Sequence, residues 1–174
     1  MAPRRRDTDC QLTFLAPADA AVLQLVRENL RLLSELRPSY RSAARGGPNG
    51  RQVRSPQDIA DLLAPEMDAL PQEQLRVVLL DTRNRVLDVV MVYQGSVNTA
   101  VARMAELFRE AIVANAPNVV LVHNHPSGDP SPSPDDVKLT KDAGQAAQLL
   151  SIDLLDHVII GDGRFVSLKE QGVL

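Results

Sequence analysis

Apolar side chains recur along this chain with two different periods, and each period predicts a different kind of element. A helix is expected over about residues 18–37, because four apolar side chains three or four residues apart form a single stripe. Those side chains are Leu23, Val26, Leu30 and Leu33. The stripe either packs against the protein's own core or forms a contact with a partner or a second copy of the chain.

Three further helices are expected in the rest of the chain. Ser55 followed by Pro56 is a typical N-cap and first helical residue. The second of these helices is expected to turn Leu107, Ala111 and Ile112 toward the core. The predicted helices span residues 55 to 63 or 67, 103–114 and 133–150.

Segments rich in Val, Leu and Ile predict five strands. The first two flank the turn Asp81–Asn84 and form a hairpin. Val119–Val122 contains no polar residue, which is typical of a strand buried on both faces. The order of strands and helices predicts an α/β sandwich with a mixed β-sheet flanked by helices. The predicted strands span residues 75–80, 85–93, 119–122, 152–160 and 164–168.

The distribution of charge divides the chain into two parts. Residues 1–54 carry ten arginines against five acidic residues, whereas residues 55–174 carry nine basic and seventeen acidic residues. Residues 38–54 contain proline and glycine but no acidic side chain, which predicts a basic linker. We therefore expect an N-terminal extension over residues 1–54 and a domain over residues 55–174. The linker is either a solvated flexible segment or a contact for nucleic acid.

The composition excludes several classes of protein. Two Tyr, three Phe and no Trp leave few aromatic platforms for stacking on single-stranded nucleic acid. Cys10 is the only cysteine, which excludes an intramolecular disulfide and a thiolate metal cluster. No segment has the apolar length of a signal-peptide core or a membrane span. These features predict a cytoplasmic protein that does not contact a membrane.

The candidate catalytic residues gather between the third predicted strand and the helix that follows it. His123 and His125 are one residue apart at a strand end, so both imidazoles point to the same side and can bind one metal ion. A proline-rich loop then returns Asp136 toward them at the start of the next helix. Because zinc uses such ligands in hydrolases, we predict that these three residues bind a catalytic zinc ion.

The same segment also has a purely structural interpretation. Ser133 is a good N-cap, and carboxylates are favoured in the first turn of a helix. Asp129 and Asp135 lie near the site and could hold the ligands in place, or Asp135 could simply begin the helix. His157 lies among apolar residues of a predicted strand and is interpreted as a structural histidine.

His123–Pro130, taken with Ser133 and Asp136, resembles the His-x-His, seven residues, Ser, two residues, Asp signature of the JAMM (MPN-type) metalloproteases. The full string His-Asn-His-Pro-Ser-Gly-Asp-Pro resembles the RadC branch of that superfamily. The resemblance covers about residues 55–174 and implies a JAMM/MPN-like sandwich. Further similar segments are residues 79–86, 95–98, 154–161 and 164–168.

The resemblance also implies a role for each residue of the site. Ser133 would donate a hydrogen bond to the oxyanion of a tetrahedral intermediate. Family members use an upstream glutamate as general base, and Glu73 is the best match here. The alternatives to Glu73 are Glu66 and Glu106. The zinc ligands would be His123, His125 and Asp136.

Two features depart from the RadC pattern. RadC proteins usually carry an N-terminal segment similar to a helix-hairpin-helix, whereas residues 1–54 contain one expected helix and a linker. A DNA-binding role therefore does not transfer directly from the family. The segment before Glu106 reads Val-Ala-Arg-Met-Ala, where relatives commonly have His-Pro-Arg-Glu, so any contribution of that histidine is missing.

Three functions follow as hypotheses. The first is a zinc-dependent hydrolase, a metallopeptidase or isopeptidase-like enzyme in which Glu73 activates a zinc-bound water. The alternative is a DNA-repair-associated nucleic-acid-binding protein or metal-dependent nuclease, supported only by the arginines of residues 1–54. The third, a binding module without activity, is disfavoured by the intact ligand set. The substrate and the oligomeric state are not specified by these residues.

Overall fold

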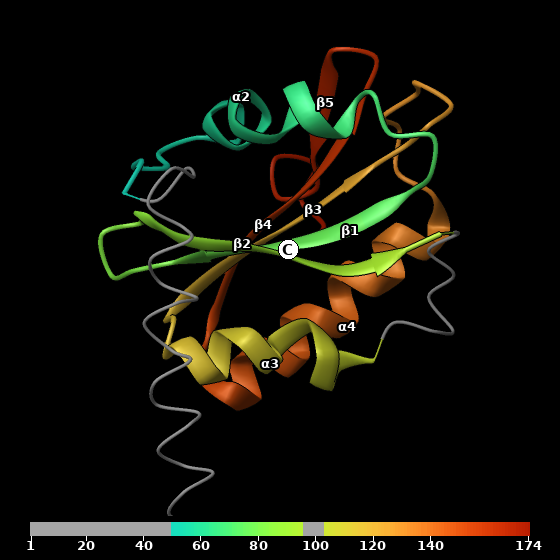
Figure 1. Cartoon of the computed structure of the whole chain (residues 1–174). Helices are drawn as coiled ribbons and strands as arrows, with labels where there is room; N and C mark the ends of the chain where they lie inside the picture. The colour runs from blue at the N-terminus through green and yellow to red at the C-terminus, as the bar shows by residue number, and fades with distance from the viewer. Residues whose placement is uncertain (1–49, 96–102) are drawn as a thin grey trace, which may run out of the picture. The chain divides into compact units, whose positions relative to one another are not determined.

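The computed structural model describes residues 50–95 and 103–174. Within them, the chain forms a five-stranded sheet with the strand order β2-β1-β3-β4-β5 (Figure 1). Neighbouring strands are antiparallel except β3 and β4, which run parallel. The elements are α2 (Pro56–Met67), β1 (Gln74–Leu80), β2 (Val86–Gln94), α3 (Met104–Ala114), β3 (Asn118–Asn124), α4 (Pro134–Leu150), β4 (Asp153–Gly161) and β5 (Arg164–Ser167).

This architecture confirms the predicted α/β class with a mixed sheet. The hairpin, the central apolar strand and the three helices all occur where the patterns predicted them. The helix expected over about residues 18–37 lies outside the described residues. The first described residues lie beside the hairpin, where Gly50 N donates to Val86 O at 2.8 Å and Val53 N donates to Asn84 O at 2.8 Å.

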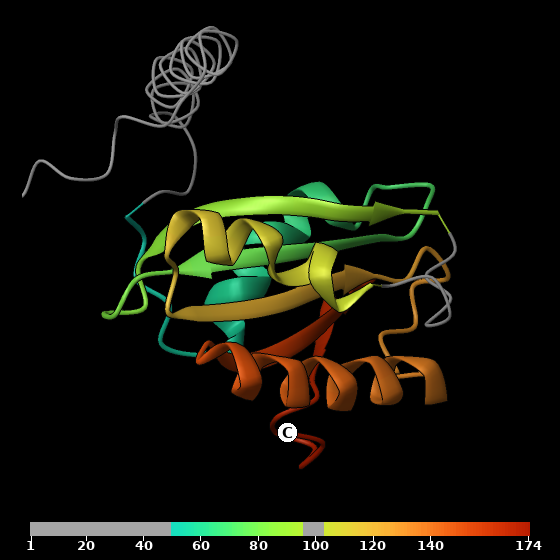
Figure 2. The ribbon, with the colours of Figure 1, turned by 90° about the horizontal axis from the view of Figure 1, so that it is seen from below.

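Helices cover both faces of the sheet. Figures 1 and 2 show α2 on one face, with α3 and α4 together on the other. All seven residues of β1 are buried, because this strand lies between the two resulting cores. Leu75, Val77 and Leu79 face the α3 and α4 side, whereas Val78 and Leu80 face the α2 side. Each such side chain contributes about 1.5–3 kcal/mol through burial.

The strand register brings distant segments to one edge of the sheet. Leu75, near the start of β1, pairs with His123 near the end of β3. His123 in turn pairs with Ile159 near the end of β4. Because β1 is antiparallel and β4 is parallel to β3, the start of β1 meets the ends of both other strands. The loop into α4 leaves β3 at this same edge.

One predicted core position of α3 is wrong. Leu107 and Ala111 are buried as expected, but the side chain of Ile112 is 56% exposed. Phe108, fully buried, takes the remaining core position. At about 100° per residue, Leu107, Phe108 and Ala111 fall within an arc of about 100°, and Ile112 lies about 40° beyond its edge.

The described residues contain no helix that is both long and apolar enough to cross a membrane.

Candidate metal centre

The two histidines of the motif meet at the end of β3. Strand alternation turns both imidazoles to the same side, as predicted, and their Nε2 atoms lie 2.9 Å apart. The chain continues beside β4 beyond the strand end, because His125 N donates to Ile160 O at 2.8 Å. His123 is 1% exposed, whereas His125 is partly exposed. One imidazole is therefore held in the core and the other borders solvent.

The first turn of α4 brings Asp136 to these imidazoles. Asp136 Oδ1 lies 3.3 Å from His123 Nε2, and Asp136 Oδ2 lies 3.6 Å from His125 Nε2. Ligands 2.0–2.1 Å from a tetrahedral zinc ion are about 3.3 Å from one another. The donor atoms of His123, His125 and Asp136 are thus spaced as ligands of one small ion would be.

Glu73 joins this group from the turn before β1. Its Oε1 lies 3.8 Å from His125 Nε2. Potential ligand atoms of Glu73, His123 and His125 all lie within 4.8 Å of one another, and this group could hold a metal ion. The carboxylate comes from a segment about fifty residues away in sequence, and the antiparallel pairing of β1 with β3 brings it to the histidines.

Asn124, the residue between the two histidines, holds the segment that carries Glu73. Its Oδ1 accepts a hydrogen bond from Gln74 N at 2.8 Å, and its Nδ2 donates to Gln72 O at 3.2 Å. Asn124 is 1% exposed, and it contacts the residues on both sides of Glu73. Strand alternation turns Asn124 away from the candidate metal site. Its side chain therefore fixes the main chain on both sides of Glu73.

The two alternative glutamates have other partners. Glu66 Oε1 accepts a hydrogen bond from Arg76 Nη2 at 2.7 Å. Glu106 accepts a hydrogen bond from the hydroxyl of Tyr93. Of the three candidates for general base, the structure places Glu73 beside the histidines.

Ser133 and Asp136 form a reciprocal cap at the start of α4. Ser133 Oγ accepts a hydrogen bond from Asp136 N at 3.2 Å and donates to Asp136 Oδ2 at 2.7 Å. Ser133 N also donates to Asp136 Oδ2 at 2.7 Å. The predicted N-cap is confirmed, and it holds Asp136 in the orientation that faces the histidines. Asp135, in the same turn, is exposed.

Asp129 contacts the site through its main chain. His125 Nδ1 lies 2.7 Å from the carbonyl oxygen of Asp129, which can only accept a hydrogen bond. The carboxylate of Asp129 instead accepts hydrogen bonds from Ser131 N and Ser131 Oγ. His125 therefore carries its proton on Nδ1 and directs Nε2 toward Asp136 and Glu73.

Two glycines allow the loop that carries His125 to lie against the β4–β5 turn. A Cβ atom at Gly161 would be 2.9 Å from both the carbonyl carbon and the oxygen of Gly128. Gly128 itself has φ +82°, a left-handed conformation that favours glycine. Arg164 Nη2 donates to Gly128 O at 3.1 Å and ties the loop to β5.

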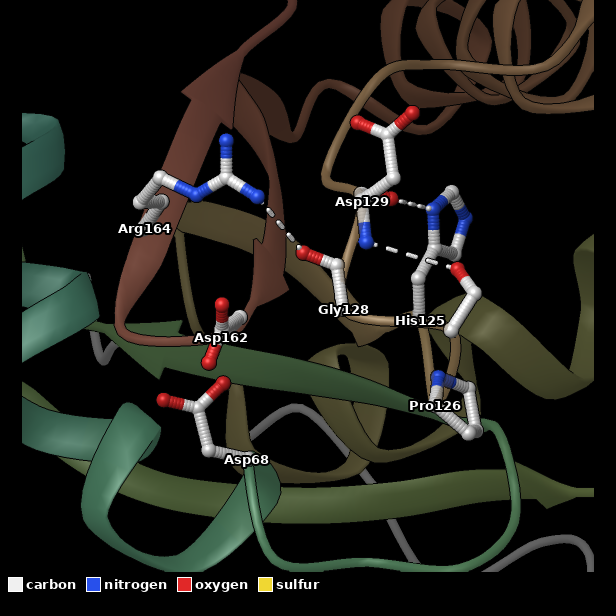
Figure 3. Close-up of a pocket in the computed structure, with 8 residues that line it drawn as sticks. Asp68, His125, Pro126, Gly128, Asp129, Asp162 and Arg164 are labelled. Carbon is white, nitrogen blue, oxygen red and sulfur yellow. Dashed lines mark hydrogen bonds between the residues drawn. The ribbon is translucent and has the colours of Figure 1, made fainter.

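A cavity of about 380 Å³ adjoins His125 on this side (Figure 3). The loop after β3 forms one wall, and the β4–β5 turn and the end of α2 form the other. Asp68 Oδ2 accepts a hydrogen bond from Gly163 N at 2.9 Å, which joins the end of α2 to the turn. Of the candidate ligands, His125 lines this cavity. It is lined by Asp68, His125, Pro126, Ser127, Gly128, Asp129, Asp162 and Arg164.

Burial and the mutual contacts of the ligands shift their pKa values. Burial holds the pKa of His123 well below its usual range. Burial alone would raise the pKa of Asp136, but its interactions with His125, His123 and Ser133 lower it. Contact with Asp136 raises the pKa of His125. A neutral His123 and an ionised Asp136 are the forms that bind a metal, whereas a protonated His125 would release its proton on binding.

His157 lies behind His123, in the core, and is 0% exposed. Its Nε2 is 2.8 Å from His123 Nδ1, and its Nδ1 is 2.6 Å from Thr140 Oγ1. Burial lowers the pKa of His157 to about 4. This is the hydrogen-bonded structural histidine that the sequence predicted, but its partner is a candidate ligand. Thr140 was missed, although its position four residues after Asp136 places both on one helix face.

This mixed sheet, with two histidines and an aspartate at one edge, has the features of a JAB (MPN-like) domain. The model of the RadC-like JAB domain family matches residues 53–173, so the chain belongs to that family. Membership of this family indicates a hydrolase-like or metal-dependent function.

Curated relatives support the same family. A UPF0758 protein of Roseiflexus castenholzii is 52% identical over 122 residues, which cover 70% of this chain and 52% of the relative. Another, of Chloroflexus aurantiacus, is 50% identical over 121 residues, which cover 70% of this chain and 53% of the relative. A third, of Clostridium beijerinckii, is 45% identical over 126 residues, which cover 72% and 55%. The chain thus spans about half the length of these relatives, and their names state no activity.

Proposed function

We propose that this domain is a zinc-dependent hydrolase that cleaves an amide bond, as in a peptide or an isopeptide. The observation that carries the proposal is the meeting of His123, His125 and Asp136 with the carboxylate of Glu73 at one edge of the sheet. Two imidazoles and a carboxylate are a donor set that suits zinc in hydrolases. Zinc bound there would polarise a carbonyl group and lower the pKa of a water molecule to about 7.

Glu73 is the residue suited to proton transfer. Its side chain is 22% exposed, so it can reach both water and a substrate that enters from solvent. We assign to it the acceptance of a proton from the attacking water and the return of that proton to the leaving nitrogen. The contacts of Asn124 with both neighbours of Glu73 favour one position of the carboxylate during this exchange.

Ser133 would stabilise the oxyanion that develops on the attacked carbonyl. Its hydroxyl proton is donated to Asp136 Oδ2 in the structure. The proposed role therefore requires the hydroxyl to turn from Asp136 toward the substrate while Ser133 N keeps its own hydrogen bond to the same carboxylate oxygen.

Zinc content and hydrolysis, measured on the same protein samples, test this proposal. The full chain should contain about one zinc ion, and His123→Ala should remove most of it. Glu73→Gln should retain zinc but slow hydrolysis by roughly 10²–10⁴-fold, because only the proton acceptor is lost. Glu66→Gln is the matched control and should leave both quantities close to wild type, since Glu66 pairs with Arg76 instead. Elemental analysis and a panel of peptide, isopeptide and nucleic-acid substrates provide the measurements.

Near-stoichiometric zinc in His123→Ala would rule out the proposed centre. Cleavage of nucleic acid without cleavage of any amide would replace the peptidase proposal with a metal-dependent nuclease. Equal activity of Glu73→Gln and wild type would remove Glu73 from the mechanism while leaving the zinc site intact.

A further inference from the structure

A buried chain of hydrogen bonds runs behind His123, on the side of its ring opposite the candidate metal position. His123 Nδ1 is 2.8 Å from His157 Nε2, and His157 Nδ1 is 2.6 Å from Thr140 Oγ1. Thr140 Oγ1 is also 2.6 Å from the main-chain oxygen of Asp136. The side chains are almost completely buried, with exposures of 1% for His123 and 0% for Thr140 and His157. Solvent therefore cannot replace a missing donor in this chain.

The direction of each hydrogen bond follows from its last member. The carbonyl oxygen of Asp136 can only accept, so the single hydroxyl proton of Thr140 is donated to it. Thr140 Oγ1 must then accept from its other neighbour, which places a proton on His157 Nδ1. Complete burial favours the neutral form of His157. Its Nε2 therefore carries a lone pair. His123 Nδ1 must therefore donate, and the free lone pair of His123 lies on Nε2.

We infer that Thr140 and His157 are positioning residues that fix His123 in the tautomer whose Nε2 lone pair faces His125 and Asp136. The consequence for zinc rests on the proposed function, whereas the tautomer itself does not. In the opposite tautomer, His123 would direct an N–H bond toward the position where a metal requires a lone pair. The Asp136 main-chain oxygen and His157 Nδ1 would then both need the single hydroxyl proton of Thr140, and one buried acceptor would be left unpaired.

The two candidate ligand histidines reach the same state by different routes. His125 Nδ1 donates directly to the carbonyl oxygen of Asp129 at 2.7 Å, so one contact settles its tautomer. His123 Nδ1 instead faces another imidazole, which can either donate or accept. Only the link through Thr140 to a main-chain carbonyl removes this ambiguity. That carbonyl belongs to Asp136, whose carboxylate faces the other nitrogen of His123.

Nitrogen NMR of the metal-free full chain tests the tautomers without any need for activity. The sequence contains only three histidines, so long-range ¹H–¹⁵N correlations can assign every ring. In wild type, His123 and His157 should both carry their proton on Nδ1, with an unprotonated Nε2. Thr140→Val keeps the shape of the side chain but removes the hydroxyl acceptor. In that variant the proton of each ring should move from Nδ1 to Nε2, because His157 then retains only the contact of its Nε2 with His123.

Zinc affinity, measured by competition with a chromophoric chelator, provides the second readout. Thr140→Val should weaken zinc binding by roughly 10–100-fold, the usual effect of removing a residue that orients a ligand. Thr140→Ser restores a hydroxyl at the same carbon, so it should restore both the wild-type tautomers and most of the affinity. A purely structural role for Thr140 would alter thermal stability without reversing the tautomers.

A proton on His157 Nε2 in wild type would overturn the inference, whatever the variants do. Unchanged tautomers in a folded Thr140→Val would overturn it as well. If wild type binds no zinc but shows the expected tautomers, the proposed function fails and the inference about the tautomer of His123 stands. If wild type binds zinc but His157 carries its proton on Nε2, the inference about the tautomer fails and the proposed function stands.

Discussion

The helices α2 and α4 begin with the same sequence pattern, Ser-Pro-x-Asp, at residues 55–58 and 133–136. In both, the serine side chain caps the helix, the proline occupies its first turn, and the aspartate carboxylate accepts a hydrogen bond from the serine N. Asp58 Oδ2 accepts from Arg54 N at 2.9 Å and Ser55 N at 3.0 Å. Asp136 Oδ2 accepts from Ser133 N at 2.7 Å. As local structures, the two helix starts are equivalent.

Their surroundings differ. Asp136 is 3% exposed and lies against His123 and His125, whereas Asp58 is only partly buried beside Arg54. The capping contacts in each case are made through Oδ2, and in Asp136 this leaves Oδ1 directed at His123 Nε2. A capping aspartate thus becomes a candidate ligand through the elements that pack against it. The cap orients the carboxylate of Asp136, and His123 and His125, at the end of β3, provide the other candidate ligands.

The largest difference between the two aspartates should be in metal content. Asp136→Ala should lose most of its zinc, because it removes one of three proposed ligands, whereas Asp58→Ala should retain about one zinc ion per chain. Both variants remove the same half of a capping box, so loss of helix stability alone cannot explain a difference between them. Elemental analysis of purified protein measures the zinc, and circular dichroism confirms that both variants are folded.

Equal zinc contents in the two variants would show that Asp136 is only a cap. The proposed centre would then need a different third ligand, and Glu73 is the remaining described carboxylate within 4.8 Å of both histidines.

Much of the fold follows from local patterns in the sequence. Val119–Val122 and Leu75–Leu80 read as buried strands because nearly every position is apolar, and both strands are buried. The predicted turn Asp81–Asn84 joins β1 to β2, and its last residue, Asn84, adopts φ +54°, a conformation that asparagine tolerates. The strand end, the proline-rich loop and the motif spacing predicted that His123, His125 and Asp136 lie together, and in the structure their side chains do. Ile112 was predicted to face the core but is exposed, because apolarity by itself does not specify which helix face meets the sheet.

The rest of the site depends on pairing between strands, which local patterns do not specify. Glu73 reaches His125 because β1 pairs antiparallel with β3. The sequence favoured Glu73 but left Glu66 and Glu106 as alternatives. His157 reaches His123 because β4 runs parallel to β3 and places Leu121 opposite His157. That Asp129 contacts His125 through its carbonyl oxygen also has no signature in sequence, since any residue has a carbonyl oxygen.

Replacing either capping serine should lower stability by a similar amount, but only replacement of Ser133 should lower activity. Ser133→Ala and Ser55→Ala each remove one N-cap and should each lower the free energy of unfolding by about 0.5–2 kcal/mol. Ser133→Ala should also slow hydrolysis by roughly 10²–10³-fold, as expected for loss of an oxyanion donor, whereas Ser55→Ala should not. Urea unfolding and steady-state kinetics give the two quantities. A Ser133→Ala enzyme that is as active as Ser55→Ala would restrict Ser133 to capping.

The smallest expected effect is the acid response of Asp58, the aspartate that acts only as a cap. Its pKa is lowered chiefly by the hydrogen bond from Arg54 N, with further contributions from Ser55. A carboxyl group whose pKa is lower in the folded state stabilises the fold above its unfolded pKa of about 3.9. That contribution is lost as the pH falls through the lower, folded-state pKa. Because Asp58 is partly exposed, screening by solvent should keep it below about 1 kcal/mol.

Wild type and Asp58→Asn should therefore differ most in unfolding free energy at pH 6, and this difference should shrink below about pH 4 and close only below the lowered pKa of Asp58 in the folded state. Urea unfolding of the metal-free proteins at each pH measures this difference, and chelation removes any contribution from zinc bound to the folded state. Asp136 titrates in both proteins, so its effect cancels in the subtraction. A difference that stays constant from pH 6 to pH 3 would mean that the cap of α2 does not depend on the charge of Asp58. The equivalence of the two helix starts would then hold in geometry but not in electrostatics.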